Sequence, residues 1–110
     1  MLTRPVEIVF HRLEPSPSVE NLVLELTEKL ERLTPDVSSL RVVIDTPHRH
    51  GARARYSVKI EMRYAGLDLV IHHADRGDAG FDVYRAVRDG FVRAMRLAVE
   101  TAQTNVLTMS

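Results

Sequence analysis

The sequence contains no cysteine and few aromatic residues. Without cysteine, the 110-residue chain can form no disulfide bond, thiolate metal site or cysteine nucleophile. The aromatic side chains are three tyrosines and three phenylalanines, mostly at positions expected in the core. We therefore do not expect single-stranded bases to stack on aromatic rings. Any nucleic acid would be recognised through its backbone and its shape.

Long apolar runs are also missing. No stretch approaches the roughly 20 apolar residues of a membrane-spanning helix, and the N-terminus lacks the apolar core of a signal peptide. With 45% apolar and 27% charged residues, the composition is that of an ordinary globular protein. We expect a cytoplasmic protein with no membrane partner. The chain should form one domain over residues 1–110, with a core at about 5–102 and a tail at 103–110.

The chain has no net charge, since 15 basic residues balance 15 acidic ones. The two signs are nevertheless segregated along the sequence. Acidic residues dominate 14–36, whereas basic residues dominate 41–63 and arginines dominate 85–96. The neutral total therefore hides a polarised molecule.

Hydrophobic periodicity and turn signals predict the element order β-α-β-β-β-α. Ser16 and Pro17 resemble the start of a helix that Pro35 ends, and Ala65 with Gly66 predicts a tight turn. Two amphipathic helices can both bury their apolar stripes on one face of a four-stranded sheet, so the fold class is α+β. The predicted strands cover about 6–14, 39–46, 53–63 and 67–73, the helices cover about 16–34 and 82–103, and loops cover 48–51 and 74–80.

The third strand is the most regular. Its apolar residues alternate with an outward row of mostly basic ones, which could follow several phosphates. The alternative interpretation is an edge strand that its charges protect from aggregation. The candidate RNA-binding residues of this strand and of the loop before it are Arg49, Arg53, Arg55 and Lys59.

A second set of candidate RNA-binding residues lies on the last helix. At 100° per residue, Arg85, Arg88 and Arg96 follow one flank of the apolar stripe, and Arg93 lies further round toward solvent. These four arginines are the remaining candidate RNA-binding residues. The alternative is a solvated face in which they pair with Asp89 or Glu100.

His48 and His50 form the most unusual local pattern, and either RNA or a metal ion could contact them. Zinc needs three or four ligands, and with no cysteine the others would come from His11, His72 or His73, of which the last two point to opposite faces of a strand. We expect no metal and no other cofactor. The carboxylates show no paired inward placement, and no glycine-rich phosphate loop or nucleophile motif occurs. We therefore expect neither an enzyme nor a small-molecule substrate.

Three segments resemble the ribosome hibernation-promoting factors, a family that includes ribosome-associated inhibitor A and is also called the sigma-factor modulation proteins. They are Ser16-Pro17 with a helix ending in Glu28-Lys29-Leu30-Glu31-Arg32-Leu33, the string Pro47-His48-Arg49-His50, and the helix opening Asp82-Val83-Tyr84-Arg85-Ala86-Val87-Arg88-Asp89. The resemblance covers about residues 5–100 and is to short forms of the family. It implies a fold like that of double-stranded-RNA-binding domains.

The resemblance implies binding to 16S rRNA in the mRNA and tRNA channel of the small ribosomal subunit, and hence inhibition of translation during stress or stationary phase. The basic contacts of the family carry over onto the eight candidate residues named above. The chain departs from the family at Leu97, Ala98 and Val99, where many relatives have lysine or arginine, and in its acidic first helix. Two alternatives remain open: a protein-interaction module of the same fold without ribosome binding, and a histidine-based metal-binding protein.

Overall fold

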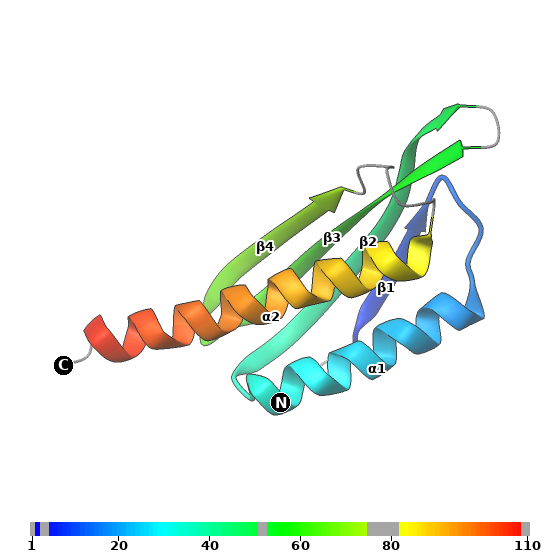
Figure 1. The fold of residues 1–110 in the computed structure, drawn as a ribbon. Coiled ribbons are helices and arrows are strands. Elements are labelled where there is room, and N and C mark those ends of the chain that lie inside the picture. The colour runs from blue at the N-terminus through cyan, green and yellow to red at the C-terminus, as the bar shows by residue number, and fades with distance from the viewer. Residues whose placement is uncertain (1, 3–4, 51–52, 75–81, 109–110) are drawn as a thin grey trace.

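A computed structural model describes residues 2, 5–50, 53–74 and 82–108 of the chain (Figure 1). The element order confirms the β-α-β-β-β-α prediction. The elements are β1 (Glu7–His11), α1 (Pro17–Leu33), β2 (Val37–His50), β3 (Arg53–Tyr64), β4 (Leu67–Ala74) and α2 (Val83–Thr108).

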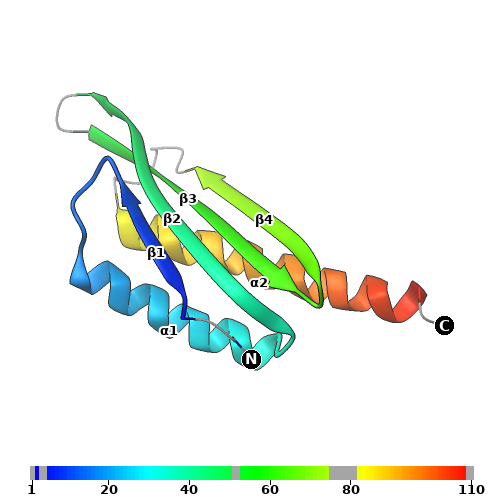
Figure 2. The ribbon, with the colours of Figure 1, turned by 180° about the vertical axis from the view of Figure 1, so that it is seen from behind.

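The four strands form one sheet in the order β1-β2-β3-β4. β1 runs parallel to β2, as a strand pair joined by a crossover helix can, and the other two pairings are antiparallel. Both helices cover the same face of the sheet, and Figure 2 shows the opposite face uncovered. The predicted two-layer α+β fold is confirmed.

The core lies between the helices and the sheet. Its residues alternate along the strands and recur at helical spacing, which is why one face of each element is apolar. The fully buried side chains of the strands are Val37, Val42, Ile44, Val58 and Ile60, and those of the helices are Val19, Val23, Leu30, Val87 and Phe91.

Helix α2 approaches the sheet closely at a glycine. A Cβ atom added to Gly90 would lie 3.2 Å from Cγ1 of Val58, which is tighter than ordinary van der Waals contact. The missing side chain allows the helix to settle on β3, and the neighbouring Phe91 is completely buried there. This contact fixes the rotation of α2 about its axis.

Helix α1 begins and ends as the sequence predicts. The Ser16 side chain accepts a hydrogen bond from the Val19 amide at 3.3 Å, and Pro17 is the first helical residue. The apolar residues at helical spacing predict a buried stripe of Val19, Leu22, Val23, Leu26, Leu30 and Leu33. This prediction is wrong at Leu33, which is 59% exposed. The buried side of the helix also includes Thr27, whose hydroxyl satisfies its hydrogen bond by donating to the Val23 carbonyl at 2.7 Å.

Strand β2 is longer than predicted. The expected loop over 48–51 is wrong for residues 48–50, which continue the strand to His50 and pair with β3. Pro47 does not end the strand because it lies at a register shift between Asp45 and His48, where the ladder is interrupted and its missing N–H group is not needed.

Helix α2 is also longer than predicted. Asp82 caps it, as expected, by accepting a hydrogen bond from the Tyr84 amide at 2.9 Å. The expectation of a frayed tail from about Thr104 is wrong for residues 104–108, because the helix continues to Thr108.

The turn between β3 and β4 has the predicted position and a strained residue. Ala65 and Gly66 have φ values of 49° and 83°, the signs of a two-residue type I′ turn. The Ala65 amide also donates to the Asp36 carbonyl at 3.1 Å, which ties the turn to the chain just before β2. Glycine tolerates a positive φ without cost, but alanine does not.

We predict that Ala65→Asn stabilises the protein by about 0.5–1 kcal/mol, because asparagine adopts a positive φ more readily than alanine. The Ala65 side chain is exposed, so the new amide meets no steric barrier. Thermal unfolding should show a midpoint higher by about 2–5 °C. Ala65→Val is the control and should lower it, and a lower midpoint for the asparagine variant would contradict the strain.

Candidate nucleic-acid interface

The four arginines of α2 all lie on its solvent-exposed side. Arg85, Arg88, Arg93 and Arg96 are exposed, while Val87 and Phe91 face the core. The 11 residue-to-residue steps from the first arginine to the last correspond to a rise of about 16 Å along the helix axis. The structure therefore brings these four predicted residues together as one row, which we call the arginine row.

Most of the positive charge in the arginine row is not neutralised within the protein. The Arg85 Nε atom lies 3.8 Å from a carboxylate oxygen of Asp89, a long contact between two half-exposed side chains. Among the residues that the structure describes, Arg88 and Arg96 have no ion-pair or hydrogen-bond partner, and Glu100 pairs with none of the four. The alternative of a self-compensated helix face therefore applies to Arg85 alone.

Arg93 is exposed and lies on the flank of α2 nearest β4. Its guanidinium lies 3.4 Å from the His72 carbonyl oxygen and 3.4 Å from Nδ1 of His73. His73 also lies 3.9 Å from the Asp89 carboxylate. The arginine row thus reaches the edge of the sheet through Arg93.

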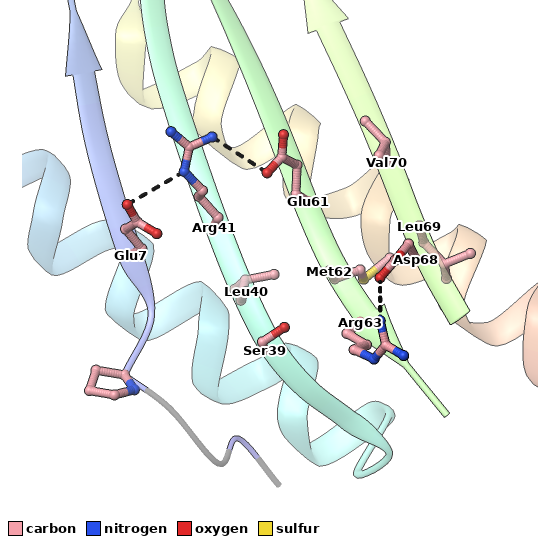
Figure 3. A pocket seen from close by; sticks show the side chains of 11 residues that line it. Glu7, Ser39, Leu40, Arg41, Glu61, Met62, Arg63, Asp68, Leu69 and Val70 are labelled. Carbon is pink, nitrogen blue, oxygen red and sulfur yellow. Dashed lines mark hydrogen bonds and ion pairs between the residues drawn. The ribbon is translucent and has the colours of Figure 1, made fainter. Parts of the chain in front are cut away.

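The uncovered face of the sheet carries charges of both signs. Lys59 Nζ lies 3.0 Å from Glu61, and Arg63 lies 3.0 Å from Asp68. Arg41 sits between Glu7 at 3.5 Å and Glu61 at 3.4 Å, as Figure 3 shows. The outward row on β3 is therefore charge-compensated at Lys59 and Arg63, by Glu61 of the same strand and by Asp68 of β4. Glu7 of β1 compensates Arg41 of β2 in the same way.

These ion pairs act on the Glu61 carboxyl group. Hydrogen bonds from Lys59 first and from Arg41 second lower the pKa of Glu61. The same face holds a shallow hollow of about 380 Å³ between the ends of β2, β3 and β4 (Figure 3). The charged side chains that line the hollow are held in ion pairs with one another and with Lys59, so none of them is free to hold an ion.

A second charged cluster joins the end of β1 to β2, and the sequence analysis missed it. Arg12 donates two hydrogen bonds to the Asp45 carboxylate, at 2.7 and 3.0 Å, and His11 Nδ1 lies 3.3 Å from the same group. The hydrogen bonds from Arg12 are the main reason that the pKa of Asp45 is lowered. Only the parallel register that pairs His11 with Asp45 brings these distant residues together.

The tip of the β2–β3 hairpin holds the other predicted basic residues. The backbone register pairs His48 with Arg55, Arg49 with Ala54, and His50 with Arg53. Three arginines and two histidines thus occupy three successive register positions. Their side chains lie outside the described part of the structure, and their contacts with RNA stay a prediction.

Among the side chains that the structure describes, His11, His72 and His73 do not assemble into a metal site. No three His, Cys, Asp or Glu groups among those side chains lie close enough to share an ion. The side chains of His48 and His50 lie outside this part of the structure. His72 pairs with Lys59 in the sheet and His73 with Val58, which confirms that the two point to opposite faces. Within the same residues, no helix is long and apolar enough to cross a membrane.

Comparison with known proteins gives matches in structure but not in sequence. No protein-family model matches the chain, and no curated protein matches it. A ribosomal subunit interface protein from Coxiella burnetii superposes with a TM-score of 0.68 at 12% identity, covering 89% of this chain and 97% of that one. The N-terminal domain of Thermus thermophilus Protein Y superposes with a TM-score of 0.64 at 18% identity, covering 86% and 96%.

This chain shares their fold. The match extends over nearly the whole length of both proteins, so it includes the sheet and both helices. The resemblance to hibernation factors, first noted on short sequence motifs, therefore extends to the three-dimensional arrangement of the elements. At these identities the fold is common and the side chains that line its surfaces are mostly different.

We predict that Asp45→Asn together with Glu61→Gln makes stability less dependent on pH in the acid range. Because the folded state lowers both pKa values, the ionised carboxylates stabilise it above their ordinary pKa of about 4, and this contribution is lost as pH falls through the folded-state values. Thermal midpoints measured between about pH 5 and 2 should fall less steeply for the double variant than for the native protein.

The control for this measurement is Glu25→Gln with Glu28→Gln, which removes the same two charges from the exposed side of α1. Neither glutamate has an ion-pair partner among the described residues. The control should retain the native slope below pH 4. Equal slopes for the two double variants would contradict a stabilising role for the sheet-face ion pairs.

Proposed function

We propose that this chain is a ribosome-associated translation inhibitor of the hibernation type, which binds small-subunit rRNA in the mRNA and tRNA channel under stress or in stationary phase. Its fold supports the proposal, because a protein named for the ribosomal subunit interface has the same fold along nearly its whole length. A shared fold alone does not fix function, so the surface has to supply the rest of the argument.

The observation that carries the proposal is the uncompensated part of the arginine row. Arg88 and Arg96 are exposed and without a partner among the described residues, on a helix where four arginines outnumber Asp89 and Glu100. A row about 16 Å long can contact several phosphates of an RNA strand. Arginine suits this role because its planar group donates two parallel hydrogen bonds to a phosphate.

In this proposal the protein acts by occupancy and makes or breaks no covalent bond. The arginine row and the basic hairpin tip hold rRNA phosphates, and the bound domain excludes mRNA and tRNA from the same space. Such contacts position the protein by RNA shape and backbone, in keeping with the small number of aromatic residues. The proposal requires no cofactor and places the protein in the cytoplasm with the ribosomes.

The acidic helix α1 is consistent with a single RNA-binding side. Its glutamates would repel phosphates, so α1 should face away from the RNA or lie at the margin of the contact. Polarity of this kind orients a protein as it approaches a polyanion.

The first experiment is co-sedimentation of the purified protein with ribosomes and with separated subunits on sucrose gradients. At about 50 mM salt we expect migration with the small subunit, and at about 500 mM salt we expect release, since phosphate contacts exchange for counterions. A protein that stays at the top of the low-salt gradient would remove the ribosomal proposal. The protein-interaction module would then be the better explanation of the fold.

We predict that Arg88→Glu with Arg96→Glu weakens small-subunit binding by about 100-fold, because two charge-assisted contacts to phosphate are lost and replaced by repulsion. The slope of log affinity against log salt should also decrease by about 1.5–2, the share of two phosphate contacts. Titrations at several salt concentrations measure both quantities.

A matched control is Lys29→Glu with Arg32→Glu on α1. It changes the net charge by the same amount at two exposed positions that also have no ion-pair partner among the described residues. We expect a change of less than about threefold for the control, since it alters only the long-range field. Equal losses for the two double variants would show that overall charge and not the arginine row governs binding.

A further inference from the structure

Strand β4 forms one edge of the sheet and has few of the features that prevent an edge strand from pairing with another strand. It is eight residues long, from Leu67 to Ala74, and its register with β3 has no shift. It contains no proline and no lysine, and its one charged residue is Asp68. Natural edge strands are usually shortened, bulged, charged or covered to prevent such pairing. The opposite edge is better protected, because β1 has five residues and Arg12, with a φ of 62°, follows it.

The turn geometry determines which backbone groups of β4 point outward. In a two-residue hairpin the residues that flank the loop, here Tyr64 and Leu67, form a hydrogen-bonded pair, and hydrogen-bonded and free positions then alternate. Asp68, Val70 and His72 therefore direct their N–H and C=O groups away from β3. The contact of Arg93 with the His72 carbonyl oxygen agrees with this assignment.

The side chains of these three residues are also exposed. Asp68, Val70 and His72 lie on the uncovered face of the sheet, and Val70 is 55% exposed. Figure 3 shows Asp68 and Val70 along β4, with no strand beyond it. Among the described residues, the one group that contacts the free edge of β4 is Arg93, at a distance of 3.4 Å and on an exposed side chain.

We propose that β4 pairs with β4 of a second copy of this chain, antiparallel and about a two-fold axis at Val70. In that register Val70 lies opposite Val70 of the second copy, and Asp68 lies opposite His72. Each of these positions presents an outward N–H and C=O, so the pairs exchange backbone hydrogen bonds. The interface is isologous, since the same strand supplies both sides.

Charge complementarity favours this occupant and this register. Across the axis the Asp68 carboxylate, which within one copy lies 3.0 Å from Arg63, comes opposite the exposed imidazole of His72 on the same uncovered face of the sheet. Two such contacts form, one on each side of the axis. A register shifted by two residues would lose both Asp68–His72 pairs, and a parallel pairing would place Asp68 beside Asp68.

The pairing extends the sheet without covering its surfaces. The two-fold axis runs perpendicular to the sheet, so the result is a continuous sheet of eight strands with all four helices on one face. The two α2 helices, which lie over the β3–β4 side of each sheet, then become neighbours across the axis. A dimer would thus present two arginine rows on the same side.

Substitutions at the axis provide a sharp test, because residue 70 faces its own copy. Val70→Lys and Val70→Glu each place two like charges opposite one another and should weaken the dimer at least about tenfold. An equimolar mixture of the two variants should restore it, since lysine then faces glutamate. Sedimentation equilibrium of the full chain between about 1 and 200 µM measures the native protein, the two charged variants and their mixture. Val70→Thr is the control and should remain dimeric.

A cross-linking experiment addresses the same axis independently. The chain has no cysteine, so Val70→Cys introduces a single thiol. Residues opposite one another in an antiparallel pair have Cα atoms about 5.5 Å apart, within the range that a disulfide spans. Mild oxidation should give a covalent dimer, whereas Val92→Cys, at a 52% exposed position on α2, should give much less at the same concentration.

A native protein that remains monomeric at 200 µM would refute the proposal. So would like-charge variants that still dimerise, a mixture that does not recover, or equal cross-linking of the two cysteine variants. The inference does not depend on ribosome binding, because sedimentation of the protein alone tests it. A monomer that binds the small subunit would refute the pairing and keep the proposed function, and a dimer that does not bind it would do the reverse.

Discussion

The contact between helix α2 and strand β3 is the constraint on which the exposed surface of the protein depends. Gly90 allows the helix to approach Val58 closely, and Phe91 fills the space beside it. Once these residues face the sheet, the 100° step of the helix determines the direction of every other side chain on it. The arginine row is exposed because the opposite side of the helix is occupied by the core, and no separate interaction has to hold it outward.

The neutral composition is explained by how the structure distributes its charges. On the uncovered sheet face, lysine and arginine are paired with carboxylates from neighbouring strands, as Arg41 is with Glu7 and Glu61. Helix α1 has an excess of glutamate, and α2 has an excess of arginine. Ion pairs between exposed groups contribute little to stability, but they do remove charge from a surface. Among the side chains that the structure describes, pairing therefore leaves α2 with the clear positive excess, and the arginines of the β2–β3 tip add to the positive charge of the molecule.

Local patterns in the sequence were sufficient to predict most of the fold. The alternation along β3, the helix start at Ser16 and Pro17, and the turn at Ala65 and Gly66 each depend on neighbouring residues and were confirmed. The errors arose where the chain uses longer-range context. Pro47 usually ends a strand, and it does not end β2 because the ladder shifts register at that point.

The candidate site could be predicted from the sequence only in part, because it also depends on contacts between residues far apart in the chain. Helical spacing placed Arg85, Arg88 and Arg96 on the exposed side of α2, and all three are exposed. Spacing could not reveal that Asp68 of β4 neutralises Arg63 of β3, because side chains from different strands meet only after the register is set. A cation in a sequence is therefore a weak indication of a phosphate site until its carboxylate neighbours are known.

Arg93 connects the two surfaces that carry the proposals. Its guanidinium belongs to the arginine row. At 3.4 Å it also contacts the carbonyl oxygen of His72, which points away from β3 at the free edge of β4. The proposed pairing of β4 requires this carbonyl oxygen for a backbone hydrogen bond with the second copy, whereas an RNA phosphate would bind the Arg93 side chain itself. A phosphate is a charged acceptor and forms the stronger hydrogen bond with arginine, so either partner would displace the intramolecular contact. Each partner that removes this contact changes the affinity for the other by the same factor in both directions.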